Sequence, residues 1–100
     1  MCVSVTPRPG PHGVTVTIDR PDVRNAMSPE IIAALDEAVV DAADEDAVRA
    51  VVVTGTGSAF SAGADIVEFA SLADDPDSVL SYLRQFAALY ETIESVPVPV

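Results

Sequence analysis

The stretch Ala50-Val51-Val52-Val53-Thr54, followed by Gly55-Thr56-Gly57-Ser58, decides the fold class of this 100-residue chain. Its β-branched residues form a short continuous apolar run, which is typical of a strand buried on both faces of a sheet. The glycines that follow predict a turn at the end of the strand. Because a strand pattern and a helical pattern both precede this run, the sequence predicts an α/β fold.

Two shorter strand patterns lie near the N-terminus, on either side of a turn. Their apolar residues alternate with polar ones, as in half-buried strands. These residues are Val3, Val5, Val14, Val16 and Ile18. Between them, residues 7–13 are dense in Pro and Gly, so this region predicts a β-hairpin or meander. His12 lies in this turn without Cys, Asp or Glu at ligand spacing, and we expect it to be solvated rather than to bind a metal.

A first helix is predicted to begin at Ser28-Pro29-Glu30, which combines a favoured N-cap, a proline suited to the first helical position and an acid in the first turn. Apolar residues follow at helical spacing. They are Ile31, Leu35, Ala38, Val39 and Ala42. The opposite face is acidic and is expected to be solvated. Its residues are Glu30, Glu37, Asp41 and Asp44.

Two further helices are predicted downstream. A short one begins near Asp65, where Glu68 three residues later completes an Asx version of the capping box and is expected to be a solvated or capping carboxylate. A long one begins at Asp74-Asp75-Pro76-Asp77. Its apolar stripe is expected to face the core or a subunit interface. The residues of that stripe are Val79, Leu83, Phe86, Tyr90 and Ile93.

The charge balance excludes several functions. Lys+Arg number 5 and Asp+Glu 16, for a net charge of −11, and no lysine is present. A chain without lysine has neither a P-loop lysine nor a Schiff-base amine, and its negative field disfavours nucleic acid. Adaptation to concentrated salt and a codon bias towards Arg both account for the acidity. The sequence has no apolar run long enough to span a membrane, no signal peptide and only one cysteine. We therefore expect a cytoplasmic protein with no membrane span and no intrachain disulfide.

The segment 55–66 carries the strongest chemical signal, and it reads Gly55-Thr56-Gly57-Ser58-Ala59-Phe60-Ser61-Ala62-Gly63-Ala64-Asp65-Ile66. A dinucleotide fingerprint fails because Phe60 stands where its third glycine belongs. Small residues instead deliver backbone N–H groups to a helix N-terminus, which stabilises negative charge, and Gly63 can aim the next N–H outward. The alternative is an ordinary strand-to-helix connection whose amides bind water.

Two separated motifs carry a family resemblance. Arg20-Pro21-Asp22-Val23-Arg24-Asn25-Ala26-Met27-Ser28 is followed by a helix, a strand that ends Val53-Thr54-Gly55, and then residues 60–66. In this order they resemble the N-terminal part of the enoyl-CoA hydratase/isomerase (crotonase) family, from about Val14 to Val100. The resemblance implies a crotonase-like spiral of ββα units, with residues 1–100 as the N-terminal part of a single domain.

The resemblance also implies a function. Family members bind acyl-CoA thioesters and stabilise an enolate in an oxyanion hole, and the position of Ala64 supplies one backbone N–H of that hole. The implied reaction is hydration of 2-enoyl-CoA in fatty-acid or branched-chain catabolism, with no metal and no cofactor beyond the CoA of the substrate. Further positions match the family's CoA and acyl site. They are Arg24, Ala26, Ala62, Gly63, Asp65 and Ile66.

Alternatives remain open for three of these side chains. Arg24 could bind a phosphate or pair with Asp22 or Glu30. Asp65 could contact the ligand or serve as a helix N-cap. Asn25 is expected to fix the turn through bonds to the backbone rather than to touch substrate.

The family's second oxyanion N–H and its acid and base glutamates have no counterpart in these 100 residues. We therefore expect the chain to be the N-terminal portion of a longer enzyme, truncated before the second oxyanion segment, and the family implies a homo-oligomer, a trimer or hexamer. By itself the chain should leave strand edges unpaired and apolar faces of the sheet uncovered. The alternative is a short non-catalytic protein that binds CoA or another subunit.

Overall fold

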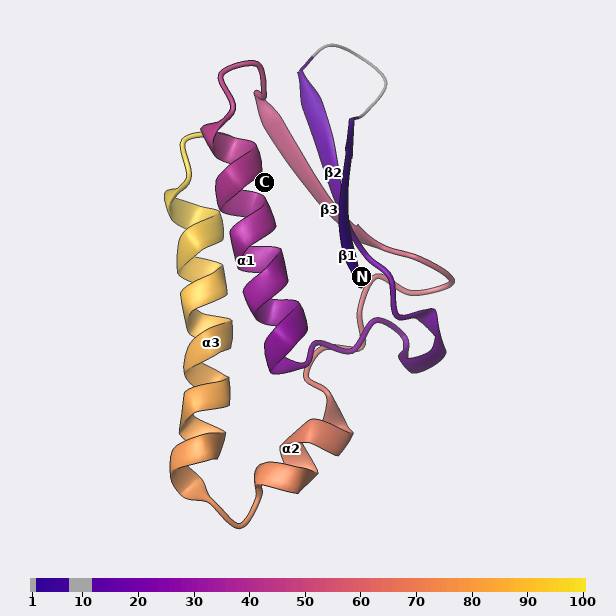
Figure 1. The fold of residues 1–100 in the computed structure, drawn as a ribbon, viewed down its shortest axis with the longest axis vertical. Coiled ribbons are helices and arrows are strands. Elements are labelled where there is room, and N and C mark those ends of the chain that lie inside the picture. The colour runs from indigo at the N-terminus through magenta and orange to yellow at the C-terminus, as the bar shows by residue number, and fades with distance from the viewer. Residues whose placement is uncertain (1, 8–11) are drawn as a thin grey trace.

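The computed structural model describes residues 2–7 and 12–100 and has the predicted α/β organisation (Figure 1). The elements in chain order are β1 (Val3–Pro7), β2 (Gly13–Ile18), a 3-10 turn η1 (Pro21–Val23), α1 (Pro29–Asp44), β3 (Ala50–Gly55), α2 (Ile66–Leu72) and α3 (Pro76–Ser95). Figure 1 shows α1 between the sheet on one side and α3 on the other, so the described chain has three layers.

The sheet has the order β1-β2-β3. β1 and β2 are antiparallel with Val5 opposite Val16, which confirms the predicted hairpin, although turn residues 8–11 lie outside the described residues. β2 and β3 are parallel with Val16 opposite Val53. β2 is therefore central, and its Val16 and Ile18 are fully buried beneath α1.

The prediction that strand 50–54 is buried on both faces is wrong for the described chain. Val51 is buried, but Val52 is 37% exposed. Successive side chains of a strand point to opposite faces, and α1 packs against only one face of this three-stranded sheet. Among the described residues, β2 is the only strand that pairs with β3. On the other edge of β3, the amide of Val51 donates to the carbonyl of Pro99 at 2.9 Å, so the residues near position 100 lie beside this edge.

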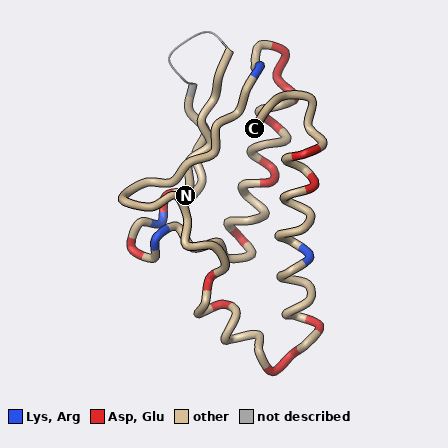
Figure 2. The backbone as a smooth tube through the Cα atoms, turned by 180° about the vertical axis from the view of Figure 1, so that it is seen from behind, with Lys and Arg blue, Asp and Glu red and all other residues tan. Residues whose placement is uncertain are grey.

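Helix α1 begins and orients as predicted. Ser28 is its N-cap, and the Ser28 hydroxyl accepts from the amide of Ile31 at 3.4 Å. The predicted residues Ile31, Leu35, Val39 and Ala42 are buried, while Ala38 is half-buried. Ile32 and Ala43 are buried as well, because α1 packs against both the sheet and α3. The predicted acidic face is exposed, and Figure 2 marks where Asp and Glu residues occur along the backbone of this helix.

The apolar stripe predicted for α3 is wrong in part. Leu83 is 50% exposed and Tyr90 58% exposed, whereas Tyr82 and Leu89 are buried. The face turned inward therefore runs through Tyr82, Phe86, Leu89 and Ile93, and it shares Phe86 and Ile93 with the predicted stripe. Two overlapping stripes exist at helical spacing, and the one with partners for its tyrosine hydroxyl is buried.

In the described part of the chain, no helix is both long and apolar enough to cross a membrane.

Candidate functional site

Two loops that are far apart in the sequence run side by side at one end of the sheet. The amide of Ala62 donates to the carbonyl of Arg24 at 2.8 Å, and the amide of Met27 donates to the carbonyl of Gly63 at 2.7 Å. An isolated parallel bridge joins Met27 and Ala64. We call residues 24–27 and 61–65 the paired loops. They bring together six of the predicted site residues, while the seventh, Ile66, is the first residue of α2 and is 81% exposed.

Asn25 ties the first loop to the connection after β3. Its side chain is fully buried, and its Oδ1 accepts from the amide of Arg20 at 2.8 Å. Its Nδ2 donates to the carbonyls of Thr56 and Ala59, at 2.8 and 3.0 Å. The predicted turn-fixing role of Asn25 is thus confirmed, and its φ of 57° places it in the left-handed region that asparagine tolerates. The hydroxyl of Ser61 adds a bond to the Asn25 carbonyl at 2.8 Å.

The amide of Ala64 points out of the paired loops. The peptide bonds are trans, so the carbonyl of Gly63 and the N–H of Ala64 point in opposite directions. Since that carbonyl faces the amide of Met27, the Ala64 N–H faces away from it. Ala64 is exposed, and its N–H has no acceptor within residues 2–7 and 12–100. An outward, unpaired donor of this kind can meet the oxygen of a ligand.

Gly63 makes this geometry accessible. Its φ is +91°, and no heavy atom lies within 4 Å of where a Cβ would stand. The backbone conformation, rather than crowding, therefore requires glycine here.

Asp65 acts as the N-cap of α2. Its Oδ1 accepts from the amides of Val67 and Glu68, at 3.1 and 3.2 Å, and its Oδ2 lies 3.3 Å from Nη1 of Arg20. The hydrogen bond from the Glu68 amide is the main influence that holds the pKa of Asp65 below its ordinary value; partial burial opposes it, and Arg20 reinforces it. The capping interpretation of Asp65 is confirmed.

Sequence reasoning missed Arg20. Besides its ion pair with Asp65, Nη1 of Arg20 donates to the carbonyl of Ala26 at 2.9 Å, so this guanidinium joins the two paired loops. Ala26 is only 7% exposed, and of the predicted site residues it has the least surface for a ligand. Nothing in the local sequence distinguishes Arg20 from Arg24, because its partner Asp65 lies 45 positions away.

Tyr82 was also missed, although it is the largest fully buried side chain described. Its hydroxyl donates to the carbonyl of Met27 and accepts from the amide of Asp65 at 2.9 Å. Burial raises the pKa of Tyr82, against the lowering effect of the Asp65 amide. The sequence did contain a signal for this role. Tyr82 lies four residues before Phe86 and therefore shares its helix face, and a tyrosine on an inward face needs a partner for its hydroxyl.

Arg24 is exposed and has a φ of 53° at the end of η1. Pairing with Asp22 or Glu30 is not found, since Arg20–Asp65 is the only ion pair among the described residues. The guanidinium of Arg24 is therefore available to an anion from outside the described chain.

An apolar hollow of about 420 Å³ opens beside the paired loops. It lies between β3, the 60–63 segment and the inward face of α3, and Val53, Phe60, Phe86 and Leu89 are among the residues that line it. Gly63 also lines it, so the residue before the outward amide borders an apolar space. A hollow of this character suits a hydrocarbon chain.

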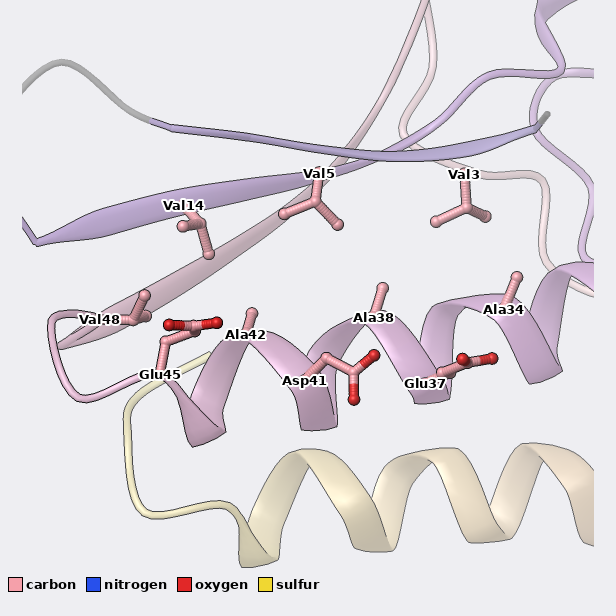
Figure 3. Close-up of a pocket in the computed structure, with 10 residues that line it drawn as sticks. All are labelled: Val3, Val5, Val14, Ala34, Glu37, Ala38, Asp41, Ala42, Glu45 and Val48. Atoms are coloured by element: carbon pink, nitrogen blue, oxygen red, sulfur yellow. The ribbon is translucent and has the colours of Figure 1, made fainter.

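A second groove does not belong to this site. It holds about 410 Å³ between α1 and the β1–β2 hairpin, and no residue of the paired loops lines it. Figure 3 shows Val5 and Val14 facing Ala38 and Ala42 across it. The carboxylates of Glu37, Asp41 and Glu45 border this groove and would repel a phosphate.

Among the described residues, no group of His, Cys, Asp and Glu side chains could hold a metal ion.

Comparison with known proteins gives a consistent result. A family model described as "Enoyl-CoA hydratase/isomerase" matches residues 12–100. A "Probable enoyl-CoA hydratase" of Bacillus subtilis is 40% identical over 85 residues, which cover 85% of this chain and 32% of that protein. The mouse mitochondrial "Delta(3,5)-Delta(2,4)-dienoyl-CoA isomerase" is 34% identical over 98 residues, covering 89% of this chain and 30% of that protein.

Solved structures agree. The enoyl-CoA hydratase of Bacillus anthracis superposes with a TM-score of 0.91 at 29% identity, over 100% of this chain and 38% of that one. The enoyl-CoA hydratase of Thermoplasma volcanium superposes with a TM-score of 0.89 at 34% identity, over 100% and 38% of the two chains. The chain thus spans about a third of the length of the relatives that it matches.

Proposed function

The chain belongs to the enoyl-CoA hydratase/isomerase family and has its crotonase-like fold, and from this premise we propose that it is the acyl-CoA-binding part of an enzyme that hydrates 2-enoyl-CoA. Residues 1–100 would be the N-terminal part of a single domain. The N–H of Ala64 would donate to the thioester oxygen and stabilise the enolate as negative charge develops there. Coenzyme A would enter as part of the substrate, and the reaction would need no metal and no other cofactor. The protein would be cytoplasmic.

The observation that carries this proposal is the outward, unpaired N–H of Ala64. Both neighbouring residues are held by the fold, so the donor needs no reorganisation when the charge develops. A single preorganised donor of this type contributes about 3–4 kcal/mol of transition-state stabilisation. Residues Ala62, Gly63 and Ile66 would border the thioester beside this amide.

The hollow beside Gly63 and the free guanidinium of Arg24 support an acyl-CoA ligand. The hollow would accept the acyl chain, and Arg24 would pair with a phosphate of coenzyme A. At a net charge of −11 the overall field repels phosphates, so a local cation is needed to bind them.

The acid and base of hydration would come from outside residues 1–100. Asp65 is the carboxylate nearest to Ala64 in the chain, but two amides and Arg20 occupy its oxygens. Its pKa is lowered, which makes it a weak base. We expect the missing groups in a longer chain or in a neighbouring subunit of a trimer or hexamer.

A pair of ligands tests the Ala64 donor directly. An acyl-CoA thioester and the corresponding thioether differ only in the carbonyl oxygen, so the ratio of their affinities reports the bond to that oxygen. We expect the protein, at the length its source produces, to prefer the thioester by about five- to tenfold, which corresponds to one hydrogen bond. Equal affinities, or no binding of either ligand, would refute the proposal.

Arg24→Gln tests the phosphate contact separately. An exposed ion pair is worth up to about 1 kcal/mol, so the affinity for both CoA ligands should fall by up to about fivefold. The affinity for the pantetheine thioester, which lacks the nucleotide phosphates, should not change. A hydration assay with 2-enoyl-CoA then separates the enzyme from the alternative, a non-catalytic CoA-binding or subunit-interaction protein, which would bind without turnover.

A further inference from the structure

The hydroxyl of Tyr82 stands between the paired loops and bonds to a backbone group of each. A parallel bridge between Met27 and Ala64 has two bonds, one from the Met27 amide to the Gly63 carbonyl and one from the Asp65 amide to the Met27 carbonyl. The first is direct, at 2.7 Å. At the second position, the Asp65 amide donates to the Tyr82 hydroxyl at 2.9 Å, and that hydroxyl donates to the Met27 carbonyl.

Both peptide groups that flank the Cα of Ala64 are therefore held. The group before it is held by the amide of Met27, and the group after it by the hydroxyl of Tyr82. Ala64 itself is exposed, so its own methyl group does little to fix it. The direction of the Ala64 N–H depends on these two bonds, one of which comes from a side chain on α3.

The ring of Tyr82 keeps its hydroxyl in place. Tyr82 is 2% exposed, and its ring centroid lies 5.4 Å from that of Phe86 and 6.4 Å from that of Phe69. A ring packed in this way holds its hydroxyl in one position, because swinging it elsewhere would displace the neighbouring rings. The inward face of α3 thus supports the loop and, through Phe86 and Leu89, also lines the apolar hollow.

We propose that Tyr82 is a positioning residue that sets the direction of the Ala64 N–H towards the carbonyl oxygen of a bound thioester. This inference rests on the proposed function, because it assigns Ala64 the same ligand. Tyr82 itself touches no ligand, and it acts through the backbone of Asp65 and Met27.

The test is Tyr82→Phe, which keeps the ring and removes the hydroxyl. We expect the preference for thioester over thioether to fall from about five- to tenfold to about twofold or less, since one hydrogen bond to the carbonyl is misdirected. Affinity for the thioether should change little. Hydrogen exchange of a peptide covering residues 62–69 should accelerate, because the Asp65 amide loses its acceptor.

Thr92→Val is the matched control. Thr92 lies on the same helix, and the change also removes a bonded hydroxyl. The Oγ1 of Thr92 makes one bond, to Oδ2 of Asp36 on α1 at 2.9 Å, whereas the Tyr82 hydroxyl makes two. A general loosening of α3 would affect both variants, whereas the thioester preference should fall only in Tyr82→Phe.

The outcomes separate the two proposals. If the unmodified protein shows no thioester preference, the proposed function fails and the role of Tyr82 fails with it. If the unmodified protein shows the preference and Tyr82→Phe retains it as fully as Thr92→Val, the positioning role is wrong while the proposed function stands. Should Tyr82→Phe not fold, amide exchange of the unmodified protein tests the role, since the Asp65 amide is expected to be protected by its bond to the Tyr82 hydroxyl. Exchange of the Asp65 amide as fast as that of a solvent-exposed amide would overturn the role of Tyr82.

Discussion

Replacing Asn25 by alanine should destabilise the protein more than any nearby surface substitution. The change deletes three hydrogen bonds, from the Arg20 amide and to the carbonyls of Thr56 and Ala59. Each intramolecular bond contributes about 1 kcal/mol, and a buried group left without a partner costs about 1–3 kcal/mol. Asn25 is fully buried, so we expect the lost hydrogen bonds to lower the free energy of unfolding by about 3–5 kcal/mol.

Backbone strain adds to this loss and can be separated from it. Asn25 has a φ of 57°, a region that costs a residue with a Cβ about 1–2 kcal/mol and that asparagine tolerates better than alanine. Asn25→Gly loses the same hydrogen bonds without this strain, so it should be about 1 kcal/mol more stable than Asn25→Ala.

Urea unfolding of the two variants, of the unmodified protein and of Ser58→Ala is the assay. Ser58 is exposed on the same connection, and its loss should change the free energy by less than about 0.5 kcal/mol. The midpoint should shift while the slope against urea stays constant, because the surface exposed on unfolding is unchanged. A loss below about 1 kcal/mol for Asn25→Ala would show that other contacts hold the loops together.

Three further outcomes concern the paired loops and the end of β3. Gly63→Ala should lose about 1–2 kcal/mol in urea unfolding because of its φ of +91°, and Gly63→Asn should lose less; equal losses would argue against backbone strain as the cause. Gly55→Ala should lose about 1–3 kcal/mol by overpacking, since its Cβ would lie 2.0 Å from the Phe60 carbonyl oxygen, and Gly55→Asn should be no better tolerated. The lowered pKa of Asp65 means that its carboxylate stabilises the fold above the ordinary carboxyl pKa, and that this contribution disappears as the pH falls through the lowered value. Asp65→Asn should therefore flatten the acid limb of a stability-against-pH curve, and an unaltered limb would contradict the contribution of Asp65.

Much of the fold was predictable because local chemistry specifies it. Ser28 and Asp65 are N-caps whose side chains bond to amides two or three residues away, so a short window of sequence contains both partners. The hairpin and the strand at 50–54 follow from alternation and β-branching in the same local way. The outward direction of the Ala64 amide was also predictable, because a glycine at position 63 can adopt the positive φ that turns the next N–H outward.

The burial of α3 and the bonds that hold the site were not predictable, because they join distant parts of the chain. Periodicity indicates which residues share a helix face, but two overlapping stripes share Phe86 and Ile93, and the choice between them depends on what packs against the helix. Exposure of Val52 likewise depends on which strands and helices cover the sheet.

By itself, the sequence determined the family, the α/β order of elements and the position of the outward amide at Ala64. Only the tertiary structure decided that Arg20 joins the two loops and that the Tyr82 hydroxyl bonds to both of them. The physical reason is separation along the chain. The Tyr82 hydroxyl bonds to a carbonyl 55 residues away, and no local pattern can specify a hydrogen bond whose two atoms meet only after the sheet, α1 and α3 have packed together.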